Sequence, residues 1–400
     1  MPITWLEDID PNELANQRVL LRVDLNVPID DAGNIMDAER ILLALPTIRY
    51  LLRAKAKVVI LSHLGRPKGK KKASLSLEPV AIYLRDLLDQ EVTFVHDCVG
   101  DGVTRIVGNA EPGSVIFLEN VRFHAGEEKN DPVFAKLLAK NMDIYVDDAF
   151  GAIHRAHASV DGVVKFFDRP RGGLLLKKEL DAFARIVTQP ERPLIAVIGG
   201  SKVSSKIGVL LQLLKKVDAL LIGGAMAYTF LRAQGERVGK SLVEEDKLGL
   251  ALNLLRKARE LSVNVYLPKD HVVTTNIATK EDLRIVAANH FADDDIGVDI
   301  GPETVKEYRR IVLGAATIFC NGPMGMYEQE EFALGTNEVL KAVADADGYS
   351  MVGGGDSIAA LNRAGLSKKI DFISSGGGAG LELLEGKKLP GLVALGYYDS

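Results

Sequence analysis

The stretch LIAVIGGSKVSSKIGVLLQLLKKVDALLIGG (194–224) decides the fold of this chain. It begins and ends with short apolar runs, 194–200 and 219–224, and each run finishes in a pair of glycines. Runs of this length that are rich in Val, Ile and Leu are typical of strands buried on both faces of a parallel sheet. Residues 202–216 between them have helical spacing. The stretch therefore predicts a strand–helix–strand unit in an α/β protein.

The same alternation extends over most of the 400 residues. Further strands are expected at 19–27, 57–64, 114–121, 143–150, 263–268, 316–322, 348–355 and 371–378. Further helices are expected at 76–90, 132–141, 244–262 and 302–313. Because a domain takes roughly 150 residues, a chain of this length suggests two. The pattern predicts two doubly wound, Rossmann-like parallel sheets, each in its own lobe.

The segments that follow the strands differ between the two halves of the chain. In the first half they are polar, as in RVDLNVP (22–28) and SHLGRP (62–67), whereas in the second half they are runs of glycine. Ligands of open parallel sheets lie outside the carboxyl ends of the strands, so two kinds of ending indicate two ligand sites. The stretch FFDRPRGGLLLKKEL (166–180) is the expected junction and hinge. We place the lobes at 1–172 and 173–385.

Composition excludes several classes of protein. Lys and Arg number 49 against 54 Asp and Glu, for a net charge of −5, so there is no basic excess for nucleic acid. The longest uncharged apolar stretch, 219–231, is shorter than the roughly 20 residues of a membrane span. Two cysteines, Cys98 and Cys320, make no disulfide framework, and the N-terminal residues have no signal-peptide character. We expect a cytoplasmic protein with small-molecule substrates.

Positive side chains gather at the strand ends of the first half, namely Arg22, Arg40, Arg66, Arg122, Arg155 and, nearby, His63. Guanidinium groups match phosphate and carboxylate oxygens in pairs, so several converging arginines would hold a small polyanion. Asp24 and Asn26 alternate with apolar residues and face the same way. They orient a ligand or, alternatively, serve only the turn before Pro28. His124, His154 and His157 have no metal-ligand spacing, and His96 and His271 are expected to be structural.

The second half offers backbone amides where the first offers side chains. Lys202 and Lys206 are expected on one face of the first turns of a helix, where a bound anion would offset their repulsion by the helix dipole. The alternative is two solvated lysines. GGGDS (353–357) opens another predicted helix, with Asp356 either a Mg²⁺ ligand beside phosphates or a plain N-cap. Gly376–Gly378 present a second amide surface. The common nucleotide-binding fingerprints are absent from the sequence.

Taken together, these segments resemble the phosphoglycerate kinase family. The resemblance runs in order from RVDLNVP through SHLGRP, HRAHAS (154–159), GGSKVSSK (199–206), NGPMG (321–325) and GGGDS to SSGGGAGLELLEG (374–386). It implies reversible phosphoryl transfer between ATP and the carboxylate of 3-phosphoglycerate, giving 1,3-bisphosphoglycerate and ADP, with Mg²⁺. It also implies a cytosolic monomer whose tail, 386–400, packs back on the first lobe.

The resemblance assigns roles to individual residues. The 3-phosphoglycerate site would comprise Asp24, Leu25, Asn26, Arg40, His63, Leu64, Gly65, Arg66, Arg122 and Arg155. The nucleotide site would comprise Gly200, Ser201, Lys202, Lys206, Gly223, Gly224, Gly297, Asn321, Glu328, Gly354, Gly355, Asp356 and Ser357. Arg40, Lys202, Lys206, Gly377 and Gly378 would serve the transfer itself, and Asp356 would hold the metal.

The chain departs from the family pattern at a few positions. Cys320 stands where the family commonly has Trp, Ser201 replaces a usual Ala, and Ser357 a usual Thr. The segment HFADDDIGVDIGP (290–302) lacks a Trp-Met pair before Gly297, on the adenine side. Two alternatives remain open at this point. They are an oxidoreductase that uses a dinucleotide, and a two-lobed anion-binding protein without catalytic activity.

The proposed reaction agrees with the residues present. A carboxylate acceptor is already ionised at pH 7, so phosphoryl transfer needs alignment and positive charge but no general base. The reacting atoms must approach to about 3–3.5 Å, which predicts closure of the two lobes about the hinge.

Overall fold

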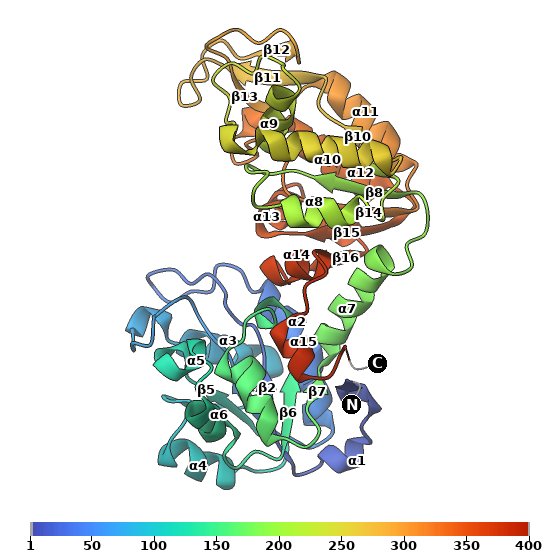
Figure 1. Ribbon diagram of the computed structural model, residues 1–400. Helices are drawn as coiled ribbons and strands as arrows, with labels where there is room; N and C mark the ends of the chain where they lie inside the picture. Colours follow the sequence, from blue (N-terminus) through green and yellow to red (C-terminus); the bar gives the residue numbers. More distant parts are fainter. Residues whose placement is uncertain (1–2, 399–400) are drawn as a thin grey trace. The chain divides into compact units, whose positions relative to one another are not determined.

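A computed structural model of the chain describes residues 3–398 (Figure 1). Contacts divide it into two compact units, one of residues 1–180 with 388–400 and one of residues 181–387. The first boundary lies eight residues beyond the expected 172/173. The reason is helix α7 (Leu174–Val187), whose first turns bind the first unit. Leu176 N donates to Asp148 Oδ1 at 2.9 Å, and Lys177 pairs with Glu7 at 3.2 Å.

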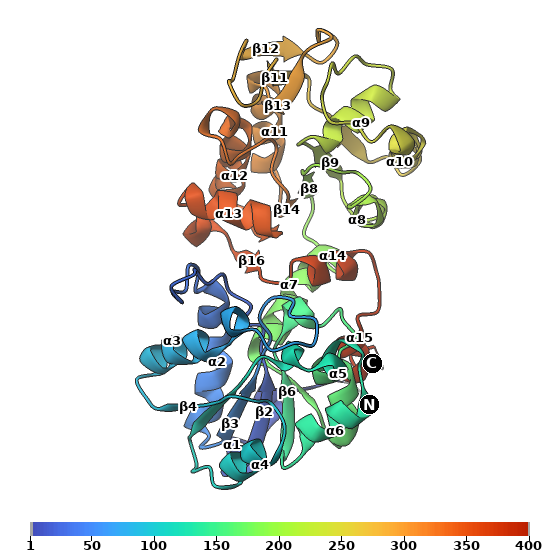
Figure 2. The same ribbon diagram turned by 90° about the vertical axis from the view of Figure 1, so that its left-hand side faces the viewer.

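The first unit is built on a seven-stranded parallel sheet of order β1-β7-β6-β2-β3-β5-β4. Its strands are β1 (Thr4–Trp5), β2 (Arg18–Arg22), β3 (Lys57–Leu61), β4 (Val92–Val95), β5 (Val115–Leu118), β6 (Ile144–Asp147) and β7 (Arg171–Gly172). Its helices, besides the start of α7, are α1 (Pro11–Leu14), α2 (Glu39–Arg53), α3 (Glu78–Leu88), α4 (Asp101–Gly108), α5 (Ala125–Glu128), α6 (Pro132–Ala139) and α15 (Pro390–Ala394). Figure 2 shows α2 and α3 on one side of this sheet and α5 and α6 on the other.

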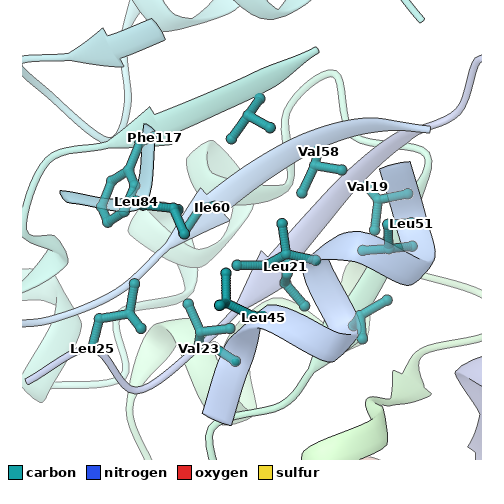
Figure 3. Packing of buried hydrophobic residues seen from close by; sticks show 14 of the residues in the cluster. Val19, Leu21, Val23, Leu25, Leu45, Leu51, Val58, Ile60, Leu84 and Phe117 are labelled. Carbon is teal, nitrogen blue, oxygen red and sulfur yellow. The ribbon is translucent and has the colours of Figure 1, made fainter. Parts of the chain in front are cut away.

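The core of the first unit follows from the period of two along its strands. Val19 and Leu21 of β2 face the same way as Val58 and Ile60 of β3, and all four are fully buried. They pack against Leu45 and Leu51 of α2, with Leu84 of α3 and Phe117 of β5 nearby (Figure 3). The alternate residues, among them Leu20 and Val59, are equally buried on the opposite face. Burial on both faces explains why the sequence shows continuous apolar runs.

The C-terminal segment belongs to the first unit from residue 388 onward. Helix α15 packs on the turn Ala158–Gly162, and Gly391 N donates to Ile153 O at 3.0 Å. Residues 399–400 of the expected tail lie outside the described residues.

The second unit contains a six-stranded parallel sheet of order β10-β9-β8-β14-β15-β16. Its strands are β8 (Leu194–Ile198), β9 (Ala219–Ile222), β10 (Asn264–Tyr266), β14 (Thr317–Asn321), β15 (Tyr349–Gly353) and β16 (Phe372–Ser374). The helices are α8 (Ile207–Leu213), α9 (Met226–Ala233), α10 (Leu248–Glu260), α11 (Pro302–Leu313), α12 (Leu334–Asp345), α13 (Gly355–Arg363) and α14 (Gly378–Leu384). In Figure 2, α8, α9 and α10 lie on one side of the sheet and α11, α12 and α13 on the other. The α/β fold with two parallel sheets is thus confirmed.

Two features of the second unit differ from the sequence prediction. An antiparallel sheet of β11 (Asp270–Thr274), β12 (Arg284–Ala287) and β13 (Ile296–Ile300) was not predicted, since polar residues interrupt the apolar runs of β11 and β13 and β12 is largely exposed. The helix expected at 202–216 begins only at Ile207, with Lys206 as its N-cap. Residues before it are held in turns, where Ser204 N donates to Glu244 Oε2 at 3.0 Å. Within residues 3–398, no helix is both long and apolar enough to span a bilayer.

Candidate active site

The predicted substrate residues of the first unit follow neighbouring strands of one sheet. Strand β2 pairs with β3 and β6, and β3 pairs with β5, all in parallel. Their carboxyl ends therefore lie along one edge, and the segments that leave these ends carry Asp24, His63, Arg122 and Arg155. We call this edge the arginine edge.

Asp24 is the electrostatic centre of the arginine edge. Arg40, from the first turn of α2, donates through Nη1 to Asp24 Oδ2, and His63 Nε2 lies 3.9 Å from Asp24 Oδ1. Burial acts to raise the pKa of Asp24, but interaction with His63, Arg40 and Arg22 outweighs it and lowers the pKa to about 2. Burial also lowers the pKa of His63 well below its ordinary value, and the neighbouring arginines act in the same direction. Asp24 is therefore ionised and His63 neutral near pH 7.

The loop after β3 is tied to its neighbours through backbone groups. Asn26 Oδ1 accepts from Gly65 N at 2.8 Å, and Gly65 O accepts from Arg122 Nη1 at 2.8 Å. Leu25 and Leu64 turn their side chains into the core, at 0% and 4% exposure. Only the backbone of these two predicted site residues can face a ligand.

Three arginines of the edge have no acidic partner among the described residues. Arg66 is exposed, Arg155 is half-buried and Arg122 is buried, and none of them forms an ion pair. Burial, together with repulsion from Arg22 and Arg155, lowers the pKa of Arg122 to about 10. Its Nε is buried without a hydrogen-bond partner. A cluster of like charges with an unsatisfied donor is suited to a small polyanion.

Arg22 differs from the others and corrects the expectation that it faces a ligand. Its side chain is 0% exposed and donates to Ser159 Oγ at 2.9 Å. As the last residue of β2 it points into the interior, and the apolar residues on both sides of it in the sequence do not indicate this.

His124 stands apart from this cluster of arginines. It stacks on Phe134 and bonds Asp97 Oδ1 through Nε2 at 2.7 Å, and its candidate ligand atom lies within 4.8 Å of those of Asp97 and Cys98. Asp97 Oδ1 also accepts from Cys98 N at 2.7 Å. These bonds anchor the Asp97 loop to the short helix Val121–Phe123, which carries Arg122.

The corresponding edge of the second unit is lined by glycine-rich segments, and we call it the glycine edge. Lys206 lies at its centre, with Nζ 3.0 Å from Asn321 O and also bonded to Asn321 Oδ1. Asn321 Nδ2 in turn donates to Gly353 O at 2.8 Å, which links β14 to β15. Burial lowers the pKa of Lys206 to about 8, although Cys320 and Asp356 oppose the shift. No carboxylate pairs with Lys206 within residues 3–398.

The two predicted lysines are not equivalent. Lys202 is exposed in the turn before α8, whereas Lys206 is largely buried, so they do not share a helix face as predicted. The loop conformation, with Gly200 at φ +120°, leads the chain away from helical geometry here.

Asp356 is free for a ligand. The N-cap of α13 is Gly354, at φ +91°, which removes the alternative that Asp356 merely caps this helix. Asp356 is exposed, while the next residue, Ser357, is buried and accepts at Oγ from Gly322 N. One exposed carboxylate close to Lys206 fits the usual way in which Mg²⁺ is held beside phosphates.

Beside Asp356 lies a pocket of about 410 Å³ within the second unit. The predicted residues that line it are Gly200, Ser201, Gly224, Gly297, Glu328 and Asp356. Residues that the sequence analysis missed supply its apolar surface, among them Tyr228, Ile277 and Met324. Ile277 and Gly297 come from the unpredicted antiparallel sheet and its loops. A methyl group at Gly297 would lie 2.0 Å from Tyr228 Oη, so only glycine fits against this ring.

The remaining predicted glycines of the second unit lie outside the pocket lining. Gly223 abuts Met324, since a Cβ at Gly223 would lie 2.3 Å from its Sδ. Gly377, the N-cap of α14, has φ +49° and open space around its Cα, and Gly378 is the first residue of that helix. Their amides are available to a ligand.

Comparison with known proteins agrees with this arrangement. A family model described as "Phosphoglycerate kinase" matches residues 6–387. Phosphoglycerate kinase of Moorella thermoacetica is 52% identical over 383 residues, covering 96% of this chain and 97% of the relative. That of Anaeromyxobacter dehalogenans is 49% identical over 391 residues, covering 97% and 99%.

Solved structures give the same result. The phosphoglycerate kinase structure from Coxiella burnetii superimposes with a TM-score of 0.90 at 41% identity, over 100% of both chains. The structure from Pyrococcus horikoshii gives a TM-score of 0.84 at 35% identity, over 99% of this chain and 100% of that one. These matches remove the two alternatives, an oxidoreductase and a non-enzymatic anion-binding protein. The chain belongs to the phosphoglycerate kinase family.

Proposed function

We propose that the arginine edge binds 3-phosphoglycerate, that the glycine edge and its pocket bind Mg-ATP, and that a phosphoryl group passes reversibly between them. Phosphoglycerate kinase activity in glycolysis is the activity of the family. The residue roles are our proposal. The observation that carries them is the cluster of Arg66, Arg122 and Arg155, none of which forms an ion pair among the described residues, so that positive charge gathers at this edge and favours an anion.

On the arginine edge, the phosphate of the substrate is held by the three unpaired arginines and approached by His63. Asp24 and Asn26 orient the glycerate part. The site also includes backbone groups of Leu25, Leu64 and Gly65. Arg40 lies at Asp24 with its side chain 35% exposed, so it reaches the carboxylate of the substrate and the oxygens of the transferring group.

On the glycine edge, the pocket receives the adenine, and Glu328 at its rim receives the ribose. Lys206 and Lys202 contact the nucleotide phosphates, and Gly354, Gly355 and Ser357 line their path, with Asn321 holding Lys206. Asp356 would hold Mg²⁺, which, when bound, neutralises charge on the β- and γ-phosphates. Gly377 and Gly378 supply amides to the oxygens of the group in transfer.

The chemistry asked of these residues is alignment and charge compensation. The attacking carboxylate is already ionised, so no residue has to remove a proton. Arg40, Lys206 and the amides at Gly377 and Gly378 stabilise negative charge on the equatorial oxygens of the transition state. Water must be excluded, since hydrolysis of ATP competes. Charge compensation and exclusion of water both require the two ligands to meet. Closure of the two units about the segment 166–180 therefore stays a prediction. A solution scattering profile that does not change when both substrates are added would contradict it.

We also infer a cytoplasmic monomer. Cys98 and Cys320 are unpaired and buried, as expected in a reducing compartment. The monomer is an inference from the resemblance, and sedimentation of the full chain tests it.

The test is ATP-dependent formation of 1,3-bisphosphoglycerate from 3-phosphoglycerate with Mg²⁺, coupled to NADH oxidation by glyceraldehyde-3-phosphate dehydrogenase. We expect rapid turnover that EDTA abolishes. Binding of ATP without turnover would contradict the assignment of 3-phosphoglycerate as the phosphoryl acceptor. Absence of ATP binding by the folded protein would contradict the assignment of the glycine edge as the nucleotide site. The double variant Arg122→Gln/Arg155→Gln should bind ATP normally but lose affinity for 3-phosphoglycerate.

A further inference from the structure

Arg22 is a buried cation that the proposed mechanism does not use. All of its described contacts are internal. Nε donates to Ser159 Oγ at 2.9 Å, Nη1 donates to Val23 O, and Nη2 lies 3.1 Å from His63 Nδ1. With 0% exposure it cannot touch a ligand in solution, and its direct contact with a proposed site residue is the one with His63.

The contact with His63 determines where the imidazole carries its proton. A guanidinium group has donors and no acceptor. His63 Nδ1 must therefore accept, which requires the neutral ring with its proton on Nε2. That nitrogen lies 3.9 Å from Asp24 Oδ1, so the ring presents an N–H donor on the side of Asp24, where the proposed substrate binds.

Arg22 is held in turn by a buried acid. Ser159 Oγ accepts from Arg22 and donates to Glu127 Oε1 at 2.6 Å, while Ser159 N donates to Glu127 Oε2 at 2.9 Å. Glu127 is 0% exposed, and Arg22 supplies part of the positive charge that stabilises its ionised form. Glu127, Ser159, Arg22 and His63 thus form one continuous chain of hydrogen bonds. A buried charge is tolerated when it is paired and hydrogen-bonded in this way.

We propose that Arg22 is a positioning residue, which with Ser159 and Glu127 fixes His63 in the tautomer that bears its proton on Nε2. The inference rests on the proposed function, in which His63 approaches the anionic substrate. When the ring is fixed in this tautomer, every enzyme molecule presents the Nε2–H group of His63 as a hydrogen-bond donor to an anion. The opposite tautomer would turn a lone pair toward the same anion and repel it. The binding energy would then include the cost of changing the tautomer.

The first experiment needs no variant of Arg22. Full-length enzyme labelled with ¹⁵N-histidine is studied without ligand near pH 7, and the resonances of His63 are assigned by their loss in His63→Gln. We expect the two-bond correlation pattern of a neutral ring with hydrogen on Nε2. A proton on Nδ1, or a charged ring, overturns the proposal. The charged groups that face the ring are Asp24, Arg22, Arg40 and Arg122.

The second experiment removes the donor. In Arg22→Met we expect a mixture of tautomers and a KM for 3-phosphoglycerate raised about 10-fold, as for the loss of one hydrogen bond to a charged ligand. We expect kcat and the KM for ATP to stay within a few-fold of wild type. Arg22→Lys, which keeps a donor, should restore part of both effects. An unchanged tautomer in Arg22→Met overturns the proposal even if KM rises, because a structural defect alone would give that result.

Two further variants keep the test decisive. Arg22→Met removes a positive charge near the buried Glu127, so a second variant is needed for the case in which Arg22→Met does not fold. Ser159→Ala retains both charges and should give the same changes at smaller size, and no change in the tautomer there overturns the proposal. Arg18→Met is the matched control, since Arg18 begins the same strand and pairs with Asp143 at the surface. It should leave His63 and both KM values unaltered.

Addition of 3-phosphoglycerate separates this inference from the proposed function. If the substrate shifts the His63 resonances without changing the tautomer, the positioning role is supported. If the tautomer is as stated but saturating substrate leaves His63 unmoved while turnover is normal, the positioning role is overturned and the kinase activity stands.

Discussion

The arginine edge of the first unit and the glycine edge of the second occupy the same position in two parallel sheets, yet they are built from different groups. Arg40, Arg66, Arg122 and Arg155 bring charge on long side chains. The glycine edge has the partly buried cation Lys206 and otherwise offers backbone amides. The first arrangement depends on the number of charges that converge, while the second depends on how closely the backbone can approach a ligand. Deletion of a charge should therefore impair ligand binding at the arginine edge, and addition of a methyl group should impair it at the glycine edge.

The largest effect is expected from Arg40→Ala. Arg40 contacts Asp24 and is placed to reach the transferring group, so its loss removes charge from the transition state. Removal of one such donor lowers kcat by about 10²–10³. The KM for 3-phosphoglycerate should change far less, because the other arginines still hold the phosphate. Steady-state kinetics in the coupled assay measure both, and turnover near that of wild type would remove Arg40 from the transition state.

A smaller effect is expected from Gly297→Ala on the glycine edge. The added methyl group would lie 2.0 Å from Tyr228 Oη and must displace the ring into the pocket. Overpacking of this kind costs about 1–3 kcal/mol, which corresponds to a rise in the KM for ATP of roughly 5- to 150-fold. The KM for 3-phosphoglycerate should not change.

Gly249→Ala is the matched control for that variant. Gly249 lies in α10, and among residues 3–398, apart from its neighbours in the chain and the backbone of its own helix, no atom lies within 4 Å of a methyl group placed there. Both KM values should equal those of wild type. If Gly297→Ala raises the KM for 3-phosphoglycerate as strongly as the KM for ATP, the two edges do not bind different ligands.

Inorganic phosphate should stabilise the protein mainly through the arginine edge. At a concentration of ten times its Kd, phosphate adds about 1.4 kcal/mol, or roughly 3–6 °C in Tm for a domain of this size. Arg155→Gln should remove most of this shift, and Gly377→Ala should leave it intact. Calorimetry with and without phosphate tests the expectation. Equal loss of the shift in both variants would show that phosphate does not distinguish the edges.

The smallest effect concerns the charge on Lys206. Burial lowers its pKa from 10.5 to about 8, so between these values the unfolded chain binds the proton more tightly than the folded chain. Stability therefore rises with pH across this window, because the unfolded state holds more protons. Lys206→Met should lack this contribution. The difference between the urea midpoints of wild type and Lys206→Met should shift in favour of wild type as pH increases from 8 toward 10.5. A constant difference would mean that Lys206 is not buried in solution.

The sequence predicted the arginine edge well because parallel neighbours bring strand ends together. Once the strands are assigned correctly, the residues that follow them can be placed along one edge, as for Asp24, His63, Arg122 and Arg155. Arg22 could not be distinguished from them, since an arginine at the end of a strand looks the same whether it points outward or into the interior. Its burial follows from Ser159 and Glu127, which lie more than 100 positions away.

The glycine edge was less predictable, for two physical reasons. The segment around Lys202 and Lys206 has helical spacing, but the turn at Gly200 and the bonds from Ser204 to Glu244 keep it out of the helix. The wall of the pocket comes partly from a small antiparallel sheet whose apolar runs are interrupted by polar residues. Tyr228 and Ile277 line the same pocket from segments far apart in the sequence, so no local pattern indicated that both would lie there.

The return of the last residues to the first unit has a consequence for synthesis on the ribosome. Residues 181–387 form a unit from one continuous segment, which can fold as soon as it has emerged. The first unit is made earliest but includes residues 388–400, with α15 on the turn Ala158–Gly162. It cannot gain its final contacts until the segment from residue 388 onward has left the ribosome. The unit that is begun first is therefore completed last, and during elongation its Ile153 surface remains uncovered.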